Sequence, residues 1–243
     1  MTKRIAMWSG PRNISTAMMR SFENRDDCSV VDEPFYAYYL HATGLKHPCY
    51  EAVLAAQPTQ WSEVATQLTT DACATPLQYQ KHMTQHMLPD MDLAWTESLT
   101  HVFLIRDPRR VIASYRRAMP QVTQQDIGII RQYELYQAFS QRSAQPIPII
   151  DSQDVLENPR GLLTQLCSRL NIEFSDQMLT WPAGPRDTDG VWATHWYANV
   201  EQSTGFAKPN QTPEPELTAA LAELASDAMP YYQALYQQRL RAT

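Results

Sequence analysis

Two segments of this chain combine basic and hydroxyl side chains, and each directly follows a short apolar run that is typical of a buried strand. In the first segment, Arg12 and Asn13 are followed by the hydroxyls of Ser15 and Thr16. Free N–H groups at the start of a helix and the helix dipole both attract anions. The segment therefore predicts an anion site, with an ordinary capped helix beside a solvated Arg12 as the alternative.

The second segment holds five arginines between positions 106 and 117. Arg106 directly follows the apolar run 101–105, and Ser114 comes eight residues later. The planar guanidinium group suits phosphate, and ligands of open α/β sheets bind beyond the strand ends, so Arg106 is the best-placed anion ligand. A solvated basic helix face explains the other four, which are Arg109, Arg110, Arg116 and Arg117.

Composition restricts what these segments can bind. The net charge of −6 argues against nucleic acid or an anionic membrane as a partner, so any anion site must be local. The chain has only 7 glycines, and the closest two are six positions apart. Neither the dinucleotide fingerprint G-x-G-x-x-G nor the Walker A motif can therefore be written anywhere in the chain.

Cysteine and histidine spacing gives no sign of a metal centre. The four cysteines lie more than twenty residues apart, which favours reduced thiols in a cytoplasmic protein. His82 and His86 could share one helical face, but no third metal ligand accompanies them. The N-terminal apolar run 5–8 is too short for a signal-peptide core, and no stretch is long enough to span a membrane.

The order of expected elements positions both basic segments. Helices are expected from Ser15 or Thr16 to Phe22, from Pro108 to about Ala118, after Asn158, and from Glu214 to about Arg239. Residues 50–72 are typical of one or two helices broken at Pro58, and 77–88 of either a strand entering a helix or a helix alone. Strands are expected at 4–8, 28–31, 101–105 and 147–151.

Alternating strands and helices predict one α/β domain over residues 1–243, a three-layer sandwich around a mainly parallel sheet. The loops after four strands, at Ser9–Ser15, Glu33, Arg106 and Asp151, would then share one rim.

The two basic segments together resemble the sulfotransferase family, whose donor is 3′-phosphoadenosine 5′-phosphosulfate. The sequence of Pro11–Thr16 matches the family's phosphosulfate loop, P-[KR]-S-G-[ST]-T, at four of six positions. Arg106 and Ser114 have the eight-residue spacing of the family's strand, R-D-P-R and serine motif. The stretch 151–159 is similar to the family's Y-E-D-L stretch ahead of a proline-started helix.

This resemblance implies a P-loop-like nucleotide-binding fold and transfer of a sulfuryl group to a hydroxyl or amine of a small molecule, leaving adenosine 3′,5′-bisphosphate. It implies that Arg12 contacts the sulfuryl group, that the loop residues Asn13, Ser15 and Thr16 bind the 5′-phosphate, and that Arg106 and Ser114 bind the 3′-phosphate. Ile14 stands where the family has glycine. A β-branched residue does not relax into positive φ, so we expect a different loop backbone.

The acceptor must lose a proton as it attacks, which calls for a base. Glu33 lies in an E-P dipeptide that resembles the site of the catalytic glutamate in carbohydrate-type members, with a solvated surface carboxylate as the alternative. His82 and His86 lie in a segment similar to the lysine–histidine segment of cytosolic members. There the histidine falls two places after the lysine, a position that Met83 holds here.

Three functions remain open from the sequence. A sulfotransferase is the leading hypothesis. A nucleoside triphosphate-dependent kinase or hydrolase of similar architecture lacks its Walker lysine and glycines. A non-catalytic nucleotide-binding protein of the same fold is the third, and Ile14 is its main support. The aromatic group 192–197 is expected either to pack in the core or to line a binding pocket.

Overall fold

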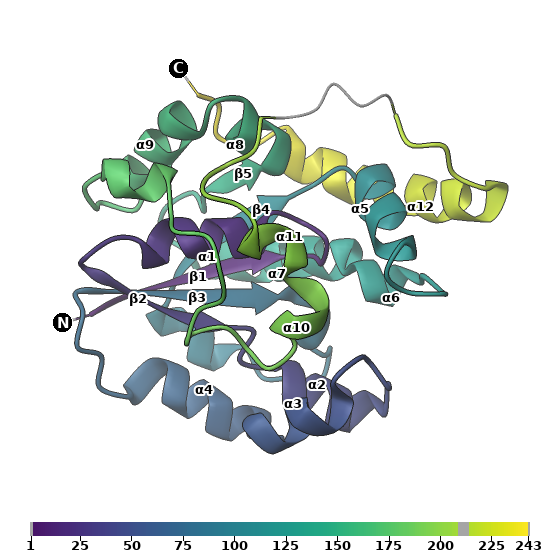
Figure 1. Ribbon diagram of the computed structural model, residues 1–243, viewed down its shortest axis with the longest axis horizontal. Coiled ribbons are helices and arrows are strands. Elements are labelled where there is room, and N and C mark those ends of the chain that lie inside the picture. Colours follow the sequence, from purple (N-terminus) through teal and green to yellow (C-terminus); the bar gives the residue numbers. More distant parts are fainter. Residues whose placement is uncertain (1, 209–213, 243) are drawn as a thin grey trace.

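A five-stranded sheet forms the centre of the computed structural model, which describes residues 2–208 and 214–242 (Figure 1). Its strand order is β2-β3-β1-β4-β5, and every pairing is parallel. The strands are β1 (Lys3–Ser9), β2 (Cys28–Asp32), β3 (Leu77–Met83), β4 (Thr100–Ile105) and β5 (Ile149–Asp151). The predicted α/β fold with a parallel sheet is confirmed.

Helices cover both faces of the sheet because the central strands are apolar on both sides. Ile5 and Met7 of β1 pack against α1 (Ser15–Glu23) and α9 (Pro159–Arg169). Ala6 and Trp8 point the opposite way, as successive strand residues must, toward α4 (Trp61–Thr70), α7 (Ile129–Arg142) and α12 (Ala219–Tyr236). The result is the expected three-layer sandwich.

The shorter elements connect these layers. After β2 the chain forms α2 (Tyr36–Thr43) and α3 (Tyr50–Ala56), and after β3 it forms the 3₁₀ turn η1 (Thr84–His86). The others are η2 (Ala94–Ser98), α5 (Pro108–Arg116), α6 (Gln124–Ile127), α8 (Ser152–Glu157), η3 (Asp176–Leu179), α10 (Ala193–Trp196) and α11 (Ala198–Glu201). Within the described ranges, no helix has both the length and the apolar character needed to cross a membrane.

Most expected element boundaries hold. The segment 50–72 forms two helices on either side of Pro58, and 77–88 forms a strand followed by a single 3₁₀ turn. Asp107 caps α5 by accepting a hydrogen bond from the Arg109 backbone N–H at 2.9 Å. The helix expected from Glu214 begins only at Ala219, because Pro215 disfavours helical backbone at the residue before it.

Gln132 of α7 joins the carboxyl ends of β1 and β4. Its buried side-chain amide donates hydrogen bonds to the carbonyls of Trp8 and Leu104, both at 2.9 Å. These two carbonyls immediately precede the loops that carry the basic segments. Gln132 therefore supports the part of the rim from which both anion-binding candidates emerge.

We expect Gln132→Leu to lower the free energy of unfolding by about 1–3 kcal/mol, because it removes two buried hydrogen bonds to strand-end carbonyls. Urea denaturation measures the change. Gln137→Leu, at an exposed position on the same helix, is the control and should stay within about 0.5 kcal/mol of the parent protein. Equal stability of the two variants would show that the amide of Gln132 does not support the strand ends.

Candidate active site

A cavity of about 400 Å³ opens at the carboxyl-end rim of the sheet. Because all five strands are parallel, the residues that follow them meet at this edge. The cavity is lined by seven of the eight residues that the sequence singled out for donor binding and catalysis, namely Arg12, Asn13, Ser15, Thr16, Glu33, Arg106 and Ser114. His82 is the exception.

Two arginines form one wall of the cavity. The Arg12 Nε donates a hydrogen bond to Ser114 Oγ at 3.1 Å, and the Arg106 guanidinium donates to the Arg12 carbonyl. Burial lowers the pKa of both guanidinium groups, and neighbouring arginines lower it further. Among the described residues neither arginine forms an ion pair with a carboxylate. This wall therefore presents positive charge that is suited to an anion.

The loop between β1 and α1 takes its unusual backbone at Arg12, whose φ is +54°. Ile14, which we expected to disturb the loop, has an ordinary φ of −83°. The Asn13 side chain braces the turn: it donates to the Leu104 carbonyl at 3.0 Å and accepts from the Ile14 N–H at 2.9 Å. A left-handed non-glycine residue that persists at a cavity is typical of a functional site.

The first turn of α1 faces the same cavity. Ile14 is its N-cap residue and provides no side-chain hydrogen bond to the helix start. Ser15, Thr16 and Ala17 line the cavity. The N-terminus of α1 therefore faces the cavity, where its free N–H groups and the positive end of the helix dipole can attract an anion.

The opposite wall contains a buried acidic cluster around Lys81. Its ammonium group donates to Asp32 Oδ1 and Glu33 Oε1, each at 2.8 Å, and also contacts the Tyr197 hydroxyl. Burial raises the pKa of Glu33, the charge of Asp32 adds to the rise, and Lys81 opposes it. A carboxylate with raised proton affinity that lines a cavity has the properties of a general base.

His82 lies outside the cavity, contrary to our expectation of a catalytic role. Consecutive residues of β3 point to opposite faces of the sheet, so Lys81 and Met83 reach the cavity whereas His82 packs into the core. Its ring stacks on Trp8 at 4.3 Å between centroids, and Nε2 bonds Gln80 at 3.1 Å. Burial lowers its pKa to about 3. His82 therefore cannot accept a proton from a molecule bound in the cavity.

The structure adds Tyr36 and His47, which the sequence reasoning did not assign, and places His86, Trp196 and Tyr197, which it named as candidates, at the cavity. Tyr36 and His47 line the cavity and are joined by a hydrogen bond of 2.9 Å between the hydroxyl and Nδ1. His86 also lines the cavity, stacked between Tyr36 and Tyr39, and burial lowers its pKa well below the usual value. Trp196 and Tyr197 belong to the cavity wall, while Trp192 is buried beneath them. Lys81 stands among Gln78, Gln80 and His82 in β3, so no apolar surroundings single it out in the sequence.

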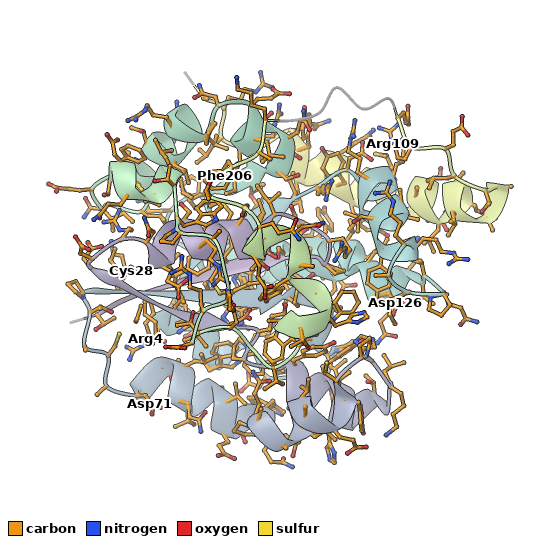
Figure 2. The ribbon with its side chains drawn as sticks, viewed as in Figure 1. Arg4, Cys28, Asp71, Arg109, Asp126 and Phe206 are labelled. Carbon is orange, nitrogen blue, oxygen red and sulfur yellow. The ribbon has the colours of Figure 1, made fainter. Side chains whose placement is uncertain are left out.

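The remaining arginines of the second segment lie elsewhere. Arg109 pairs with Asp107 and with Glu214, and it is found at the periphery of the molecule in Figure 2. Arg116 and Arg117 are exposed. Over the described ranges, no group of three or more His, Cys, Asp or Glu side chains is placed to hold a metal ion.

A parallel α/β sheet whose rim carries an anion wall and a carboxylate on one cavity has groups that a transferase could use. The sulfotransferase domain model matches residues 3–239, so the chain belongs to the sulfotransferase domain family. Membership of this family supports a transferase activity, and it agrees with the resemblance seen in the two basic segments.

Two proteins of Arabidopsis thaliana, the branched-chain-amino-acid aminotransferase-like proteins 1 and 2, are each 32% identical to this chain, over 231 and 210 residues. The matches cover 95% and 86% of this chain but 41% and 37% of those proteins. The chain thus spans about two fifths of the length of these relatives.

Solved sulfotransferase structures share the fold. The sulfotransferase domain from the curacin biosynthetic pathway has a TM-score of 0.57 at 18% identity and covers 94% of this chain and 98% of its own. The sulfotransferase domain from the Synechococcus PCC 7002 olefin synthase has a TM-score of 0.55 at 16% identity, covering 93% and 94%.

We expect Lys81→Met to lower the free energy of unfolding by about 3–5 kcal/mol at pH 8, because it leaves Asp32 and Glu33 buried without a cation. Their folded-state pKa values then rise above the unfolded ones, so this loss appears as the pH rises and shrinks toward pH 5. Denaturation at both pH values measures it. The exposed Lys46→Met is the control, and a pH-independent loss would contradict the assigned ion pairs.

Proposed function

We propose that this protein is a sulfotransferase that moves a sulfuryl group from 3′-phosphoadenosine 5′-phosphosulfate to a hydroxyl or amine of a small molecule. The observation that carries the proposal is the pair Arg12 and Arg106, two half-buried cations on one cavity wall without a carboxylate partner among the described residues. Cations held in this way favour a ligand with several anionic groups.

The residues of the anion wall fit such a donor. Arg106 and Ser114 would hold the 3′-phosphate, since the Ser114 Oγ accepts from Arg12 and keeps its own proton to donate. The first turn of α1, with Asn13, Ser15 and Thr16 beside it, would hold the 5′-phosphate. Arg12 would contact the sulfuryl group and the leaving phosphate oxygen, where it stabilises the charge that develops during transfer.

In the proposed reaction the acceptor oxygen or nitrogen bonds to sulfur as the bond from sulfur to the bridging oxygen breaks, and adenosine 3′,5′-bisphosphate leaves with the bridging electrons. The acceptor proton passes to Glu33, whose carboxylate lines the cavity opposite Arg12. Lys81 holds this carboxylate in place through its bond to Oε1. The aromatic and histidine side chains at this end, Tyr36, His47, His86 and Trp196, would surround the acceptor.

Nucleotide discrimination tests the donor assignment. We expect the protein to bind adenosine 3′,5′-bisphosphate at least about tenfold more tightly than adenosine 5′-monophosphate, because each hydrogen bond to a charged group contributes about 1.5–3 kcal/mol. Arg106→Ala should abolish the difference, and calorimetry measures both affinities.

Arg116→Ala is the matched control, since Arg116 is an exposed arginine on α5, the helix that follows Arg106, and should leave the discrimination intact. Equal affinity of the parent protein for the two nucleotides would refute the donor assignment. Tighter binding of ATP than of the bisphosphate would support the kinase or hydrolase alternative instead.

Turnover tests the base. We expect Glu33→Gln to lower turnover by about 10²–10⁴-fold and to leave the affinity for adenosine 3′,5′-bisphosphate within a few-fold, because it removes a proton acceptor and no phosphate contact. His82→Gln should keep most of the activity. Binding of the bisphosphate without any turnover of the phosphosulfate, across a panel of hydroxyl and amine acceptors, would favour the non-catalytic alternative.

A further inference from the structure

Residues 181–207, which we call the strap, cross the carboxyl-end rim between η3 and the chain that leads to α12 (Figure 1). The strap forms two ion pairs with α1: Asp189 with Arg20 at 2.6 Å, and Arg186 with Glu23 at 3.9 Å. It is also tied at a second place, where the Gly190 N–H donates to Asp32 Oδ2 at 3.1 Å. The strap therefore lies directly against the acidic cluster of the cavity.

Tyr197 is the strap residue whose side chain contacts the acidic cluster. Its buried hydroxyl lies 2.9 and 2.7 Å from the two carboxylate oxygens of Asp32, and it accepts hydrogen bonds from Lys81 and from the Trp192 indole N–H at 3.2 Å. One hydroxyl proton and two accepted bonds use the full capacity of a tyrosine oxygen. Tyr197 is thus a fixed donor to Asp32.

The cluster contains two carboxylates and one ammonium group, so one negative charge is in excess. The Asp32 carboxylate has three donors, which come from Tyr197, Gly190 and Lys81. The Glu33 carboxylate accepts a hydrogen bond from Lys81 at 2.8 Å, and the Tyr197 hydroxyl also interacts with it and lowers its pKa. Hydrogen bonds to the charged form of an acid lower its proton affinity. Burial raises the pKa of Glu33 and the bond from Lys81 opposes the rise, so the hold of Lys81 on this carboxylate sets its proton affinity.

We propose that Tyr197 is a positioning residue for Glu33: by binding Asp32 it leaves Lys81 available to hold Glu33 as a carboxylate facing the cavity. The strap, when seated, thus sets the pH above which Glu33 can accept a proton. The proposal rests on the proposed function for its catalytic meaning, although the effect on the Glu33 carboxyl can be measured without turnover.

Other ionisable groups surround the cluster from each neighbouring element. Tyr36 of α2 lies near Glu33, and burial raises the pKa of its hydroxyl, so it is neutral. His86 of η1 faces Lys81, and burial keeps its imidazole neutral as well. His47, which precedes α3 and bonds Tyr36, has a pKa that burial lowers. At neutral pH the charges that act on Glu33 from its own cluster are those of Asp32 and Lys81.

Two substitutions should shift the titration of Glu33 in opposite directions. Tyr197→Phe removes the hydroxyl that binds Asp32 and also lowers the pKa of Glu33, and Lys81 is then drawn toward Asp32. Both changes should raise the pKa of Glu33, by about one unit, since a hydrogen bond to a charged group changes proton affinity about tenfold or more. Asp32→Asn removes the neighbouring negative charge and should lower that pKa. In the doubly substituted protein the effect of Tyr197→Phe should shrink, because its partner is gone.

The side-chain carboxyl resonances of ¹³C-glutamate-labelled protein report the titration directly, with Glu33 assigned by its loss in Glu33→Gln. The acidic limb of the pH–turnover profile should move with the carboxyl in both variants. Tyr232→Phe is the matched control, because this buried hydroxyl donates to the buried carboxylate of Asp151 at 2.9 Å, away from the cavity. It should leave the Glu33 resonance unshifted, and thermal melts confirm that each variant is folded.

An unchanged pKa of Glu33 in Tyr197→Phe would overturn the inference. Shifts of this pKa in the same direction in Tyr197→Phe and Asp32→Asn would also overturn it. If the pKa of Glu33 shifts in opposite directions in the two variants but the parent protein shows no turnover of the phosphosulfate, the positioning role is supported and the proposed function is refuted. If the pKa of Glu33 shifts in opposite directions in the two variants but the acidic limb of the pH–turnover profile does not move, another group accepts the proton.

Discussion

The parallel alignment of all five strands is the constraint on which the site depends. It brings the carboxyl ends of the strands to one edge, so the charged residues that follow them must share one partly desolvated volume. Like charges there repel and opposite charges pair. This protein separates the two. Among the described residues Arg12 and Arg106 form no ion pair with a carboxylate, whereas Asp32 and Glu33 are held by Lys81.

Such a separation is unfavourable for folding by itself, because two half-buried arginines with lowered pKa values lie close together on one wall of the cavity. The surrounding contacts offset this cost locally. Arg106 binds the Arg12 carbonyl, Ser114 accepts from the Arg12 side chain, and Gln132 satisfies the two strand-end carbonyls beneath. The same hydrogen bonds therefore stabilise the rim and hold the two arginines in position to bind an anion.

Sequence patterns predicted the sheet and the anion wall because both depend on local features: apolar runs, the Asp107 cap, and residues placed directly after strands. The acidic wall depends on long-range pairing. Whether Lys81 or His82 faces the cavity turns on whether 77–88 is a strand or a helix, which periodicity left open. Lys81 meets Asp32 only because β2 and β3 pair in one register, and Tyr197 arrives from 116 residues further along the chain.

Lys81 also explains how one cavity can hold both an acid and an anion site. An unrestrained Glu33 carboxylate would be drawn to Arg12, since opposite charges in a desolvated site attract strongly, and the resulting ion pair would occupy the place of the anion. The bond from Lys81 keeps Glu33 on its own side, and no ion pair with Arg12 forms within residues 2–208 and 214–242. A buried salt bridge at this position thus acts less as a source of stability than as a spacer between two charges that must stay apart.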